Sequence, residues 1–393
     1  MLPAVLFRRF GRTGLSLSVF SCGGMRAMQS WSRGARVSDE SQANYEATVA
    51  RALEVGINHL ETARGYGTSE AQLGRILKKH PRDAYFLQTK IRPTDDPKLF
   101  EAQLDESFGL LGVQRIDLVA IHGVNTAANL EQALRAGGCC DVLQRFRRAG
   151  RVGAVGFSTH GPTPLILSAI RSQRFDYVNL HYYFIFQDNA EALAAARAED
   201  MGVFIISPTD KGGRLYRPPA KLRALCEPLS PMVFNDLWCL SHDTIHTLSL
   251  GAARPSDFDE HLQVLPLLGG ADQLLPPIVA RLERALHDAV GEDYARRWRT
   301  GIPEWRELPG RINVKRILWL RNLVRAFDLL EFAQERYAAM SPDDSWVPGA
   351  RAADFRDEEM RAALRDSPFR EQIPSLLREA HALLHDPSVT PLP

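Results

Sequence analysis

The sequence predicts an α/β protein: a (β/α)8 barrel, the TIM-barrel architecture, with a helical extension at its carboxyl end. Short apolar runs alternate with longer amphipathic stretches through the first two thirds of the chain. These runs are nearly continuous in apolar residues, as in parallel strands that are buried on both faces. Eight of them occur, most followed by a helical pattern, which is what such a barrel requires. The alternative is an open doubly wound sheet. No G-x-G-x-x-G motif, which is typical of the dinucleotide-binding members of that class, follows the first strand, so the barrel is favoured.

The expected strands are the apolar runs themselves. They are LSVFS from Leu17, INHL from Ile57, YFLQT from Tyr85, IDLVAI from Ile116, GAVGF from Gly153, YVNLHY from Tyr177, GVFII from Gly202 and HTLSL from His246. Helices are expected over residues 41–55, 141–149 and 189–201, with Gly56 and Gly150 just past the ends of the first two. Ser69 is expected to cap the helix that carries Leu73 and Leu77.

The strand signals stop after about Pro276. The rest of the chain has a helical pattern, with breaks expected at Pro303, Pro309, Pro348 and Pro374. We therefore expect a barrel over residues 1–277 and a helical extension over 278–393. A length of 393 residues suits one large barrel with an appendage.

Composition excludes several classes of protein. The hydrophobic fraction of 45% and the charged fraction of 24% are ordinary for a globular chain. Lys and Arg total 48 and Asp and Glu total 47, so no nucleic-acid or membrane partner is indicated. The five cysteines form no C-x-x-C pair, so neither a disulfide framework nor a metal site is expected. The amino terminus does not resemble a secretory signal, and we expect a cytoplasmic protein whose oligomeric state the sequence leaves open.

Polar residues stand at the ends of three consecutive strands. Glu61 follows INHL, Lys90 follows YFLQT, and His122 follows IDLVAI, while Tyr66 lies in the loop ETARGYG. Active sites of such barrels lie at the carboxyl ends of the strands, so these four side chains are expected to meet.

Together these groups could protonate a carbonyl oxygen. A free tyrosine has a pKa of about 10, and a neighbouring ammonium lowers it. A carboxylate beside the ammonium holds it in place, and an imidazole can polarise the same oxygen. The missing partner is a reductant, for which a nicotinamide hydride is the simplest source.

At this point the sequence resembles the aldo-keto reductase family. FGRTGLSLSVFSCGGMR is similar to its opening hairpin and first strand, and GINHLETARGYGTSEAQLG to its most specific signature. The resemblance implies that Tyr66 is the general acid, with Lys90 and His122 beside it. The family's aspartate is replaced here by Glu61. Its extra methylene should move the carboxylate by about 1 Å, and a shift of that size can cost about 100-fold in rate.

The resemblance also implies a nicotinamide site. Ser158, Thr159 and Asn179 match the positions that hold the carboxamide, although the residue types differ from the family's. Ser207 and Lys211 lie in the segment that wraps the pyrophosphate, and Arg254 lies where the adenosine phosphate is bound. NADPH is the expected cofactor, with NADH open because Asp257 stands where a second basic residue would be expected.

The extension is similar to the ferredoxin-like tail of one subgroup, which holds iron–sulfur clusters through C-x2-C-x2-C-x3-C-P runs. Counting back from Pro309 and Pro368 puts the thiolates at Trp298, Gly301, Glu304 and Leu308, and at Asp357, Met360, Ala363 and Ser367. No cysteine follows Cys239, so no iron–sulfur cluster is expected and the tail should be held by apolar packing.

The sequence therefore predicts an NAD(P)H-dependent reductase of small aldehydes or ketones. The main alternative is a non-catalytic or regulatory barrel that binds a nicotinamide cofactor. A lyase or isomerase using the same acid–base group is a third option. Five further residues are candidates to line the substrate pocket, with packing as the favoured role for each: Trp31, His59, His160, Tyr182 and Tyr183.

Overall fold

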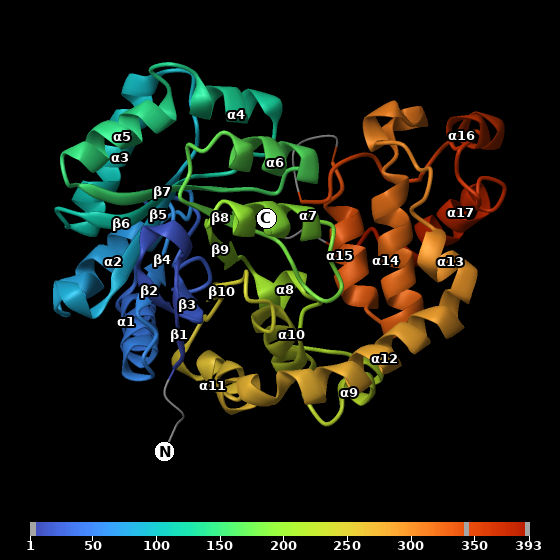
Figure 1. Ribbon diagram of the computed structural model, residues 1–393, viewed down its shortest axis with the longest axis horizontal. Coiled ribbons are helices and arrows are strands. Elements are labelled where there is room, and N and C mark those ends of the chain that lie inside the picture. The colour runs from blue at the N-terminus through green and yellow to red at the C-terminus, as the bar shows by residue number, and fades with distance from the viewer. Residues whose placement is uncertain (1–4, 342–345, 390–393) are drawn as a thin grey trace. The chain divides into compact units, whose positions relative to one another are not determined.

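The computed structural model describes residues 5–341 and 346–389 of the chain, and its course is shown in Figure 1. Eight parallel strands close into a barrel, so the predicted barrel is confirmed and an open doubly wound sheet is excluded. In order around the barrel they are β10 (Thr247–Leu250), β3 (Phe20–Gly23), β4 (His59–Glu61), β5 (Phe86–Ile91), β6 (Ile116–Ile121), β7 (Val152–Ser158), β8 (Tyr177–Leu180) and β9 (Gly202–Ile205).

The first expected strand divides between two sheets. Residues 16–18 form β2 (Ser16–Ser18), which pairs antiparallel with β1 (Phe7–Arg9), while the barrel strand β3 begins only at Phe20. Phe20 pairs instead with Leu248 of β10. The apolar run from Leu17 thus changes partners halfway, which a count of apolar residues cannot reveal.

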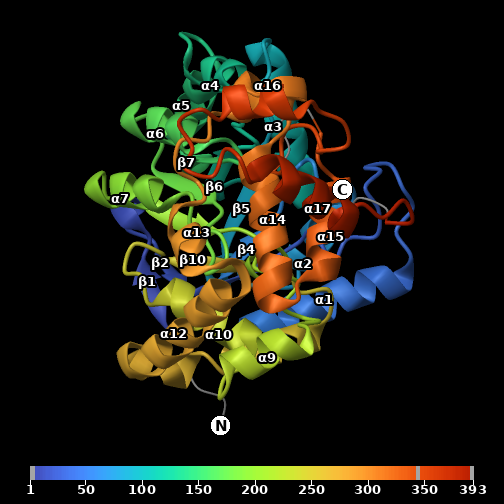
Figure 2. The same cartoon turned by 90° about the vertical axis from the view of Figure 1, so that its right-hand side faces the viewer.

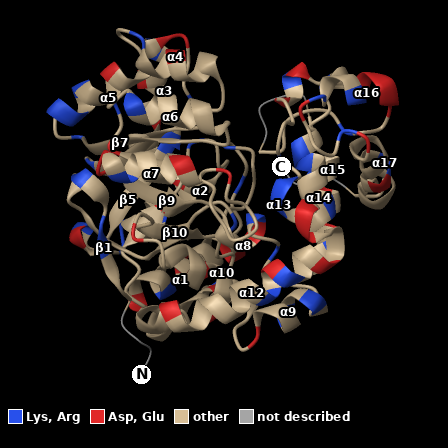
Figure 3. Ribbon diagram, turned by 45° about the vertical axis from the view of Figure 1, so that its right-hand side comes forward, with Lys and Arg blue, Asp and Glu red and all other residues tan. Residues whose placement is uncertain are grey.

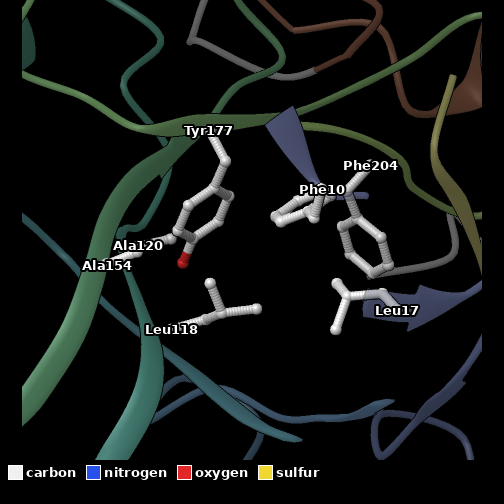
Figure 4. Packing of buried hydrophobic residues seen from close by; sticks show 7 residues of the cluster. All are labelled: Phe10, Leu17, Leu118, Ala120, Ala154, Tyr177 and Phe204. Atoms are coloured by element: carbon white, nitrogen blue, oxygen red, sulfur yellow. The ribbon is translucent and has the colours of Figure 1, made fainter. Parts of the chain in front are cut away.

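The hairpin of β1 and β2 covers the amino-terminal end of the barrel. Phe10, at its tip, is fully buried, and its ring centroid lies 5.5 Å from that of Tyr177 (Figure 4). A Cβ on Gly202 would lie 2.7 Å from the Phe10 ring, so glycine is needed there for this packing. With one end of the barrel filled by the hairpin, a reaction site is left to the carboxyl-terminal ends of the strands.

Helices surround the barrel strands. Their bounds are α1 (Asp39–Glu54), α2 (Ser69–Leu77), α3 (Pro97–Leu111), α4 (Ala127–Leu134), α5 (Cys139–Arg148), α6 (Thr163–Arg171), α7 (Ala190–Ala198), α8 (Pro208–Lys211), α10 (Pro231–Leu240) and α11 (Phe258–Leu262). Helix α1 begins earlier than expected because the Ser38 side chain accepts a hydrogen bond from the Ser41 amide. Gly56 follows its end in the left-handed region, as predicted. The expected cap at Ser69 is wrong: Ser69 is the first helical residue of α2, and its hydroxyl donates to the Gly24 carbonyl.

The chain forms two compact units. One contains residues 1–212 and 232–271, and the other contains 213–231 and 272–393. The expected boundary after residue 277 falls within the continuous helix α12, and the division into domains at that point stays a prediction. The helices of the second unit are α9 (Ala220–Cys226), α12 (Ala271–Val290), α13 (Glu292–Arg297), α14 (Val314–Phe327), α15 (Leu330–Ala338), α16 (Asp357–Ala363) and α17 (Ile373–Leu384).

Helices α14, α15 and α17 form the core of the second unit and lie side by side in Figure 2. Ile317, Leu320 and Phe327 of α14 are buried, as the apolar stripe in the sequence predicts. Arg321 and Arg325 of α14 both donate to the carboxylate of Glu379 in α17. Apolar packing therefore holds this unit, supported by charged contacts between its helices.

Charged residues of both signs are mixed along the helices (Figure 3), in keeping with the balanced composition. Among the helices formed by the described residues, none is both long enough and apolar enough to cross a membrane.

Candidate active site

The four predicted catalytic residues come together at the carboxyl-terminal ends of β4, β5 and β6. Glu61 ends β4, Lys90 is the second-last residue of β5, and His122 directly follows β6. The loop after β4 continues beside β5, since the Thr62 amide donates to the Gln88 carbonyl and the Arg64 amide to the Lys90 carbonyl (both 2.9 Å). This pairing brings Tyr66 back over Lys90.

The Lys90 ammonium uses all three of its N–H groups. It donates to the Glu61 carboxylate, to the Thr62 carbonyl (2.9 Å) and to the Tyr66 hydroxyl oxygen (3.3 Å). Its nitrogen also lies 4.7 Å from the centre of the Tyr66 ring. An ammonium has three donors and no acceptor, so Lys90 is a fixed positive charge beside the phenol.

Glu61 fits the site despite its extra methylene. One carboxylate oxygen pairs with Lys90, and the other accepts a hydrogen bond of 2.9 Å from the Ser249 hydroxyl of β10. A Cβ on Gly23 would lie 2.9 Å from that second oxygen, so glycine in β3 leaves the space that the longer side chain needs. Neither Ser249 nor Gly23 could be predicted as a partner of Glu61, because β10 and β3 lie far from β4 in the sequence and meet this site only when the barrel closes.

Two aromatic rings contact the Tyr66 ring edge to face. The His122 ring meets Tyr66 edge to face, at 5.7 Å between centroids and an interplanar angle of 87°. Trp31 meets the same tyrosine at 6.5 Å and 86°, and half of its surface is exposed. Trp31, expected to be a packing residue, is therefore an exposed neighbour of Tyr66. Its edge-to-face contact helps to hold the phenol in one orientation.

The loop that carries Trp31 is bound to the loop that carries Tyr66. The Gln29 and Ser30 amides donate to the Thr68 hydroxyl (both 3.2 Å), and the Thr68 amide donates to the Ser30 carbonyl (3.0 Å). Gly67 has a φ of +46°, and a Cβ there would lie 1.9 Å from the Ser30 carbonyl oxygen. A glycine is therefore required for the two loops to approach this closely.

Burial and charge keep Tyr66 and His122 uncharged. Burial raises the pKa of the Tyr66 hydroxyl above its ordinary value, and Lys90 acts against this without reversing it. The lowered pKa expected for Tyr66 from the neighbouring ammonium is therefore wrong, because burial outweighs the effect of Lys90. Burial, followed by Lys90 and Arg92, lowers the pKa of His122 to about 3. Burial by itself would lower the pKa of Lys90, but Glu61 and Tyr66 raise it above its ordinary value. Near neutral pH the site thus holds a phenol, a neutral imidazole and an ammonium.

The predicted carboxamide-binding residues lie at the ends of β7 and β8. Both polar atoms of the Asn179 amide are buried without a hydrogen-bond partner. The Ser158 hydroxyl accepts from the Gly123 amide (3.0 Å) and keeps its own proton to donate. The Thr159 hydroxyl already donates to the Val124 carbonyl (2.7 Å) and accepts from the Gly161 amide (2.9 Å). Asn179 and Ser158 therefore have free hydrogen-bonding capacity, while the Thr159 hydroxyl serves the backbone.

The predicted phosphate-binding residues are more dispersed. Ser207 follows β9 in the left-handed region (φ 52°, ψ 44°) and precedes α8, which ends with Lys211. Arg254 lies after β10, where its side chain is 72% exposed and pairs with Asp257 at 2.9 Å. The structure thus places Ser207 just before a short helix and Lys211 at its last residue, and leaves Arg254 on an exposed loop.

The remaining residues of interest lie beside the site or within the barrel. The His160 and His181 rings lie 4.7 Å apart after β7 and β8. Tyr182 stacks on Trp238, Tyr183 lies in the core, and His59 faces the interior of the barrel, where the Ser21 hydroxyl bonds its Nδ1 (2.7 Å). Among the described residues, no group of three or more His, Cys, Asp or Glu side chains could hold a metal ion.

Comparisons with known proteins agree with this geometry. A profile of the aldo/keto reductase family matches residues 20–223. L-glyceraldehyde 3-phosphate reductase of Escherichia coli is 22% identical over 318 residues, which cover 66% of this chain and 87% of that protein. An aldo-keto reductase of Mycobacterium sp. is 34% identical over 128 residues, covering 30% of this chain and 42% of its own length.

Solved structures share the fold at low sequence identity. An aldo-keto reductase of Bacillus halodurans in its holo form superposes with a TM-score of 0.58 at 19% identity, covering 70% of this chain and 96% of that one. A putative aldo-keto reductase of Pseudomonas aeruginosa superposes with a TM-score of 0.54 at 20% identity, covering 70% and 99% of the two chains.

Proposed function

Because the chain belongs to the aldo/keto reductase family, and is therefore an NAD(P)H-dependent oxidoreductase, we propose that it reduces a small aldehyde or ketone with Tyr66 as the proton donor. The observation that carries this proposal is the Lys90 ammonium, whose three N–H groups are committed to Glu61, Thr62 and Tyr66. That arrangement stabilises a negative charge on the Tyr66 oxygen at the moment when its proton leaves.

The residues present fit a nicotinamide carboxamide. An amide such as Asn179, buried with both polar atoms unpartnered, costs free energy unless a ligand supplies the missing hydrogen bonds. A carboxamide offers one donor group and one acceptor, which complement the two orphan atoms. We propose that Asn179 and Ser158 hold the carboxamide and that Ser207 and Lys211 contact the pyrophosphate. Thr159 would help by fixing the loop after β7.

When bound, the reduced nicotinamide supplies a hydride to the carbonyl carbon. Tyr66 transfers its hydroxyl proton to the carbonyl oxygen, and the product is an alcohol. The neutral His122 donates a hydrogen bond to the same oxygen and draws electron density away from the carbon. Lys90 keeps its own protons and stabilises the phenolate, while Glu61, fixed by Ser249, keeps Lys90 charged and in place. Solvent then returns a proton to Tyr66.

We propose NADPH as the preferred cofactor, with NADH also accepted. Arg254 is the group available for a 2′-phosphate, and it would have to leave Asp257 to reach one. The variant R254A should therefore weaken binding of NADPH and leave binding of NADH unchanged. An equal loss of affinity for NADPH and NADH would show that Arg254 stabilises its own loop and does not bind the 2′-phosphate.

The proposed reaction is tested with Tyr66→Phe. Wild-type protein should oxidise NADPH or NADH in the presence of short aldehydes, and Y66F should lose about 100- to 10,000-fold in kcat while binding the cofactor normally. Unchanged turnover in Y66F would refute the assigned proton donor. Tight cofactor binding without turnover in the wild type would favour the regulatory barrel. Conversion of substrate without a change in nicotinamide absorbance would favour a lyase or isomerase.

We propose that the helical extension is a ferredoxin-like framework without clusters. Two stretches expected to carry thiolates lie together, since a Cβ on Gly301 would approach the Asp366 carbonyl oxygen to 2.0 Å. Trp298, Leu308 and Met360 stand at thiolate positions and are buried, so apolar side chains fill the space. Anaerobic reconstitution with iron and sulfide should give no visible cluster absorbance, and appearance of such absorbance would overturn this proposal.

A further inference from the structure

Arg92 stands at the carboxyl-terminal end of β5, beside His122. Ile91 of β5 pairs in register with Ile121 of β6, and the His122 amide donates to the Ile91 carbonyl (2.7 Å). Arg92 and His122 are thus neighbours at the next level of the barrel. Side chains alternate along a strand, so Arg92 shares the face of Lys90, and His122 shares that of Ala120 in the barrel core.

The charge of Arg92 reaches the two imidazoles nearest to it. The Arg92 guanidinium adds to burial and to Lys90 in lowering the pKa of His122. It also contributes, after burial, Lys211 and His122, to lowering the pKa of His160 well below its ordinary value. Arg92 therefore lies close to the group that would polarise the carbonyl oxygen.

Three cations near Arg92 are paired with carboxylates. Lys90 pairs with Glu61. Arg33 contacts both Glu70 (3.3 Å) and Glu106 (3.0 Å). Arg64 also contacts Glu106, at 2.8 Å. The positive charge of each is thus balanced by a neighbouring carboxylate.

Arg92 differs from them. It is exposed, and within the described ranges it makes no ion pair or hydrogen bond. The two carboxylates of the following loop are engaged elsewhere. Asp95 accepts from Gln132 (3.0 Å) and lies 3.6 Å from Arg135, and Asp96 caps α3 by accepting from the Lys98 amide (2.9 Å). A guanidinium beside the reacting group, without a carboxylate to neutralise it, is suited to an anion from solution.

We propose that Arg92 binds an anionic group, a phosphate or a carboxylate, carried by the substrate on a chain short enough for its carbonyl oxygen to reach Tyr66 and His122. This proposal rests on the proposed reductase function. It assigns the substrate class: short aldehydes that bear a negative charge. A planar guanidinium binds either anion with two parallel hydrogen bonds, whereas a neutral aldehyde gains nothing from it.

The test compares matched charged and neutral aldehydes in four proteins: wild type, R92Q, R92K and R148Q. Glyceraldehyde 3-phosphate is paired with glyceraldehyde, and succinic semialdehyde is paired with butanal. Arg148 is the control because it is an exposed arginine at the last residue of α5, whose end lies at the opposite end of the barrel. The wild type should prefer the charged member of at least one pair.

In R92Q, KM for the preferred charged aldehyde should rise about tenfold, the value of one lost charged hydrogen-bonded contact. KM for the neutral partner should change less than about twofold, as should all values in R148Q. R92K keeps the charge and should recover part of the loss. The pair in which the wild type prefers the charged aldehyde more strongly shows whether the bound anion is a phosphate or a carboxylate. Equal changes for charged and neutral aldehydes, or no preference in the wild type, would overturn the proposal.

A binding measurement separates this proposal from the reductase function. The protein is first saturated with oxidised cofactor, so that the residues that contact the cofactor's phosphates are occupied. Glycerol 3-phosphate and succinate are then titrated in separate experiments. Each anion that binds should bind about tenfold more weakly to R92Q. R148Q should bind as the wild type does. If no aldehyde is reduced but this binding is seen, the reductase proposal fails and the anion site stands. If neutral aldehydes are reduced and neither anion binds, only the anion site fails.

Discussion

Replacement of Lys90 by methionine should destabilise the barrel strongly. Lys90 and Glu61 are 1% and 4% exposed, so K90M leaves a buried carboxylate whose remaining partner is the Ser249 hydroxyl. Removing one partner of a buried ion pair costs about 3–5 kcal/mol. Because the bond to Ser249 survives, we expect a loss of about 3 kcal/mol. Methionine fills nearly the same volume, so little of this loss should come from a cavity.

The assay for K90M is native-state hydrogen exchange on peptides from β4 and β5, which reports the opening free energy of the barrel itself. A double variant provides the control. K90M combined with E61L removes both charges and should recover most of the loss, to within about 1 kcal/mol of the wild type, since apolar replacement of a whole buried pair is often neutral. A loss below about 1 kcal/mol in K90M, or a double variant less stable than K90M, would refute the reasoning.

Three further predictions concern a titrating group, a loop contact and an orphan amide. Burial and Lys90 lower the pKa of His59 to about 3, so below about pH 6.5 the unfolded chain binds a proton that the folded barrel does not, and stability falls toward acid. In urea unfolding between about pH 4 and 6, the free energy of unfolding of H59Q should fall by about 1.4 kcal/mol less per pH unit than that of the wild type. The same pH dependence in both proteins would contradict this prediction. G67A should lower the free energy of unfolding by roughly 2 kcal/mol or more, because its Cβ would overlap the Ser30 carbonyl, whereas G109A in α3 meets nothing within 4 Å and should not destabilise. N179L should raise the melting temperature of the cofactor-free protein and weaken cofactor binding at least about tenfold; a lower melting temperature with unchanged affinity would show that the amide is already satisfied.

The barrel could be predicted because each strand is marked locally. The apolar run IDLVAI, for example, is buried from Ile116 to Ile121, and His122 directly after it lies at the end of the barrel that carries the site. Lys90 and His122 could therefore be brought together from sequence alone. Tyr66 was expected near Lys90 because its loop follows a strand at the same end of the barrel. The backbone pairing of this loop with β5 brings the two side chains together.

Contacts closed by distant parts of the chain could not be predicted. Ser249 and Gly23 accommodate Glu61 from β10 and β3, and neither residue carries a local signal for that role. The error at Ser69 has a similar cause, because its hydroxyl bonds the Gly24 carbonyl and does not cap its own helix. The neighbouring Lys90 led to the expectation that the pKa of Tyr66 falls. Burial has the larger effect and raises this pKa, and the degree of burial of a side chain cannot be read from the sequence.

The second compact unit is assembled from two separate stretches of chain, residues 213–231 and 272–393. The early stretch depends on the late one: the Lys221 ammonium donates to the Arg325 carbonyl (3.0 Å), and Arg214 pairs with Glu335 (2.8 Å). On the ribosome, residues 213–231 therefore emerge before their partners exist, while the last barrel strand is synthesised between the two stretches. A truncation after residue 271 would therefore leave residues 213–231 without their partners. This early stretch can complete its contacts only after the carboxyl-terminal residues have been synthesised.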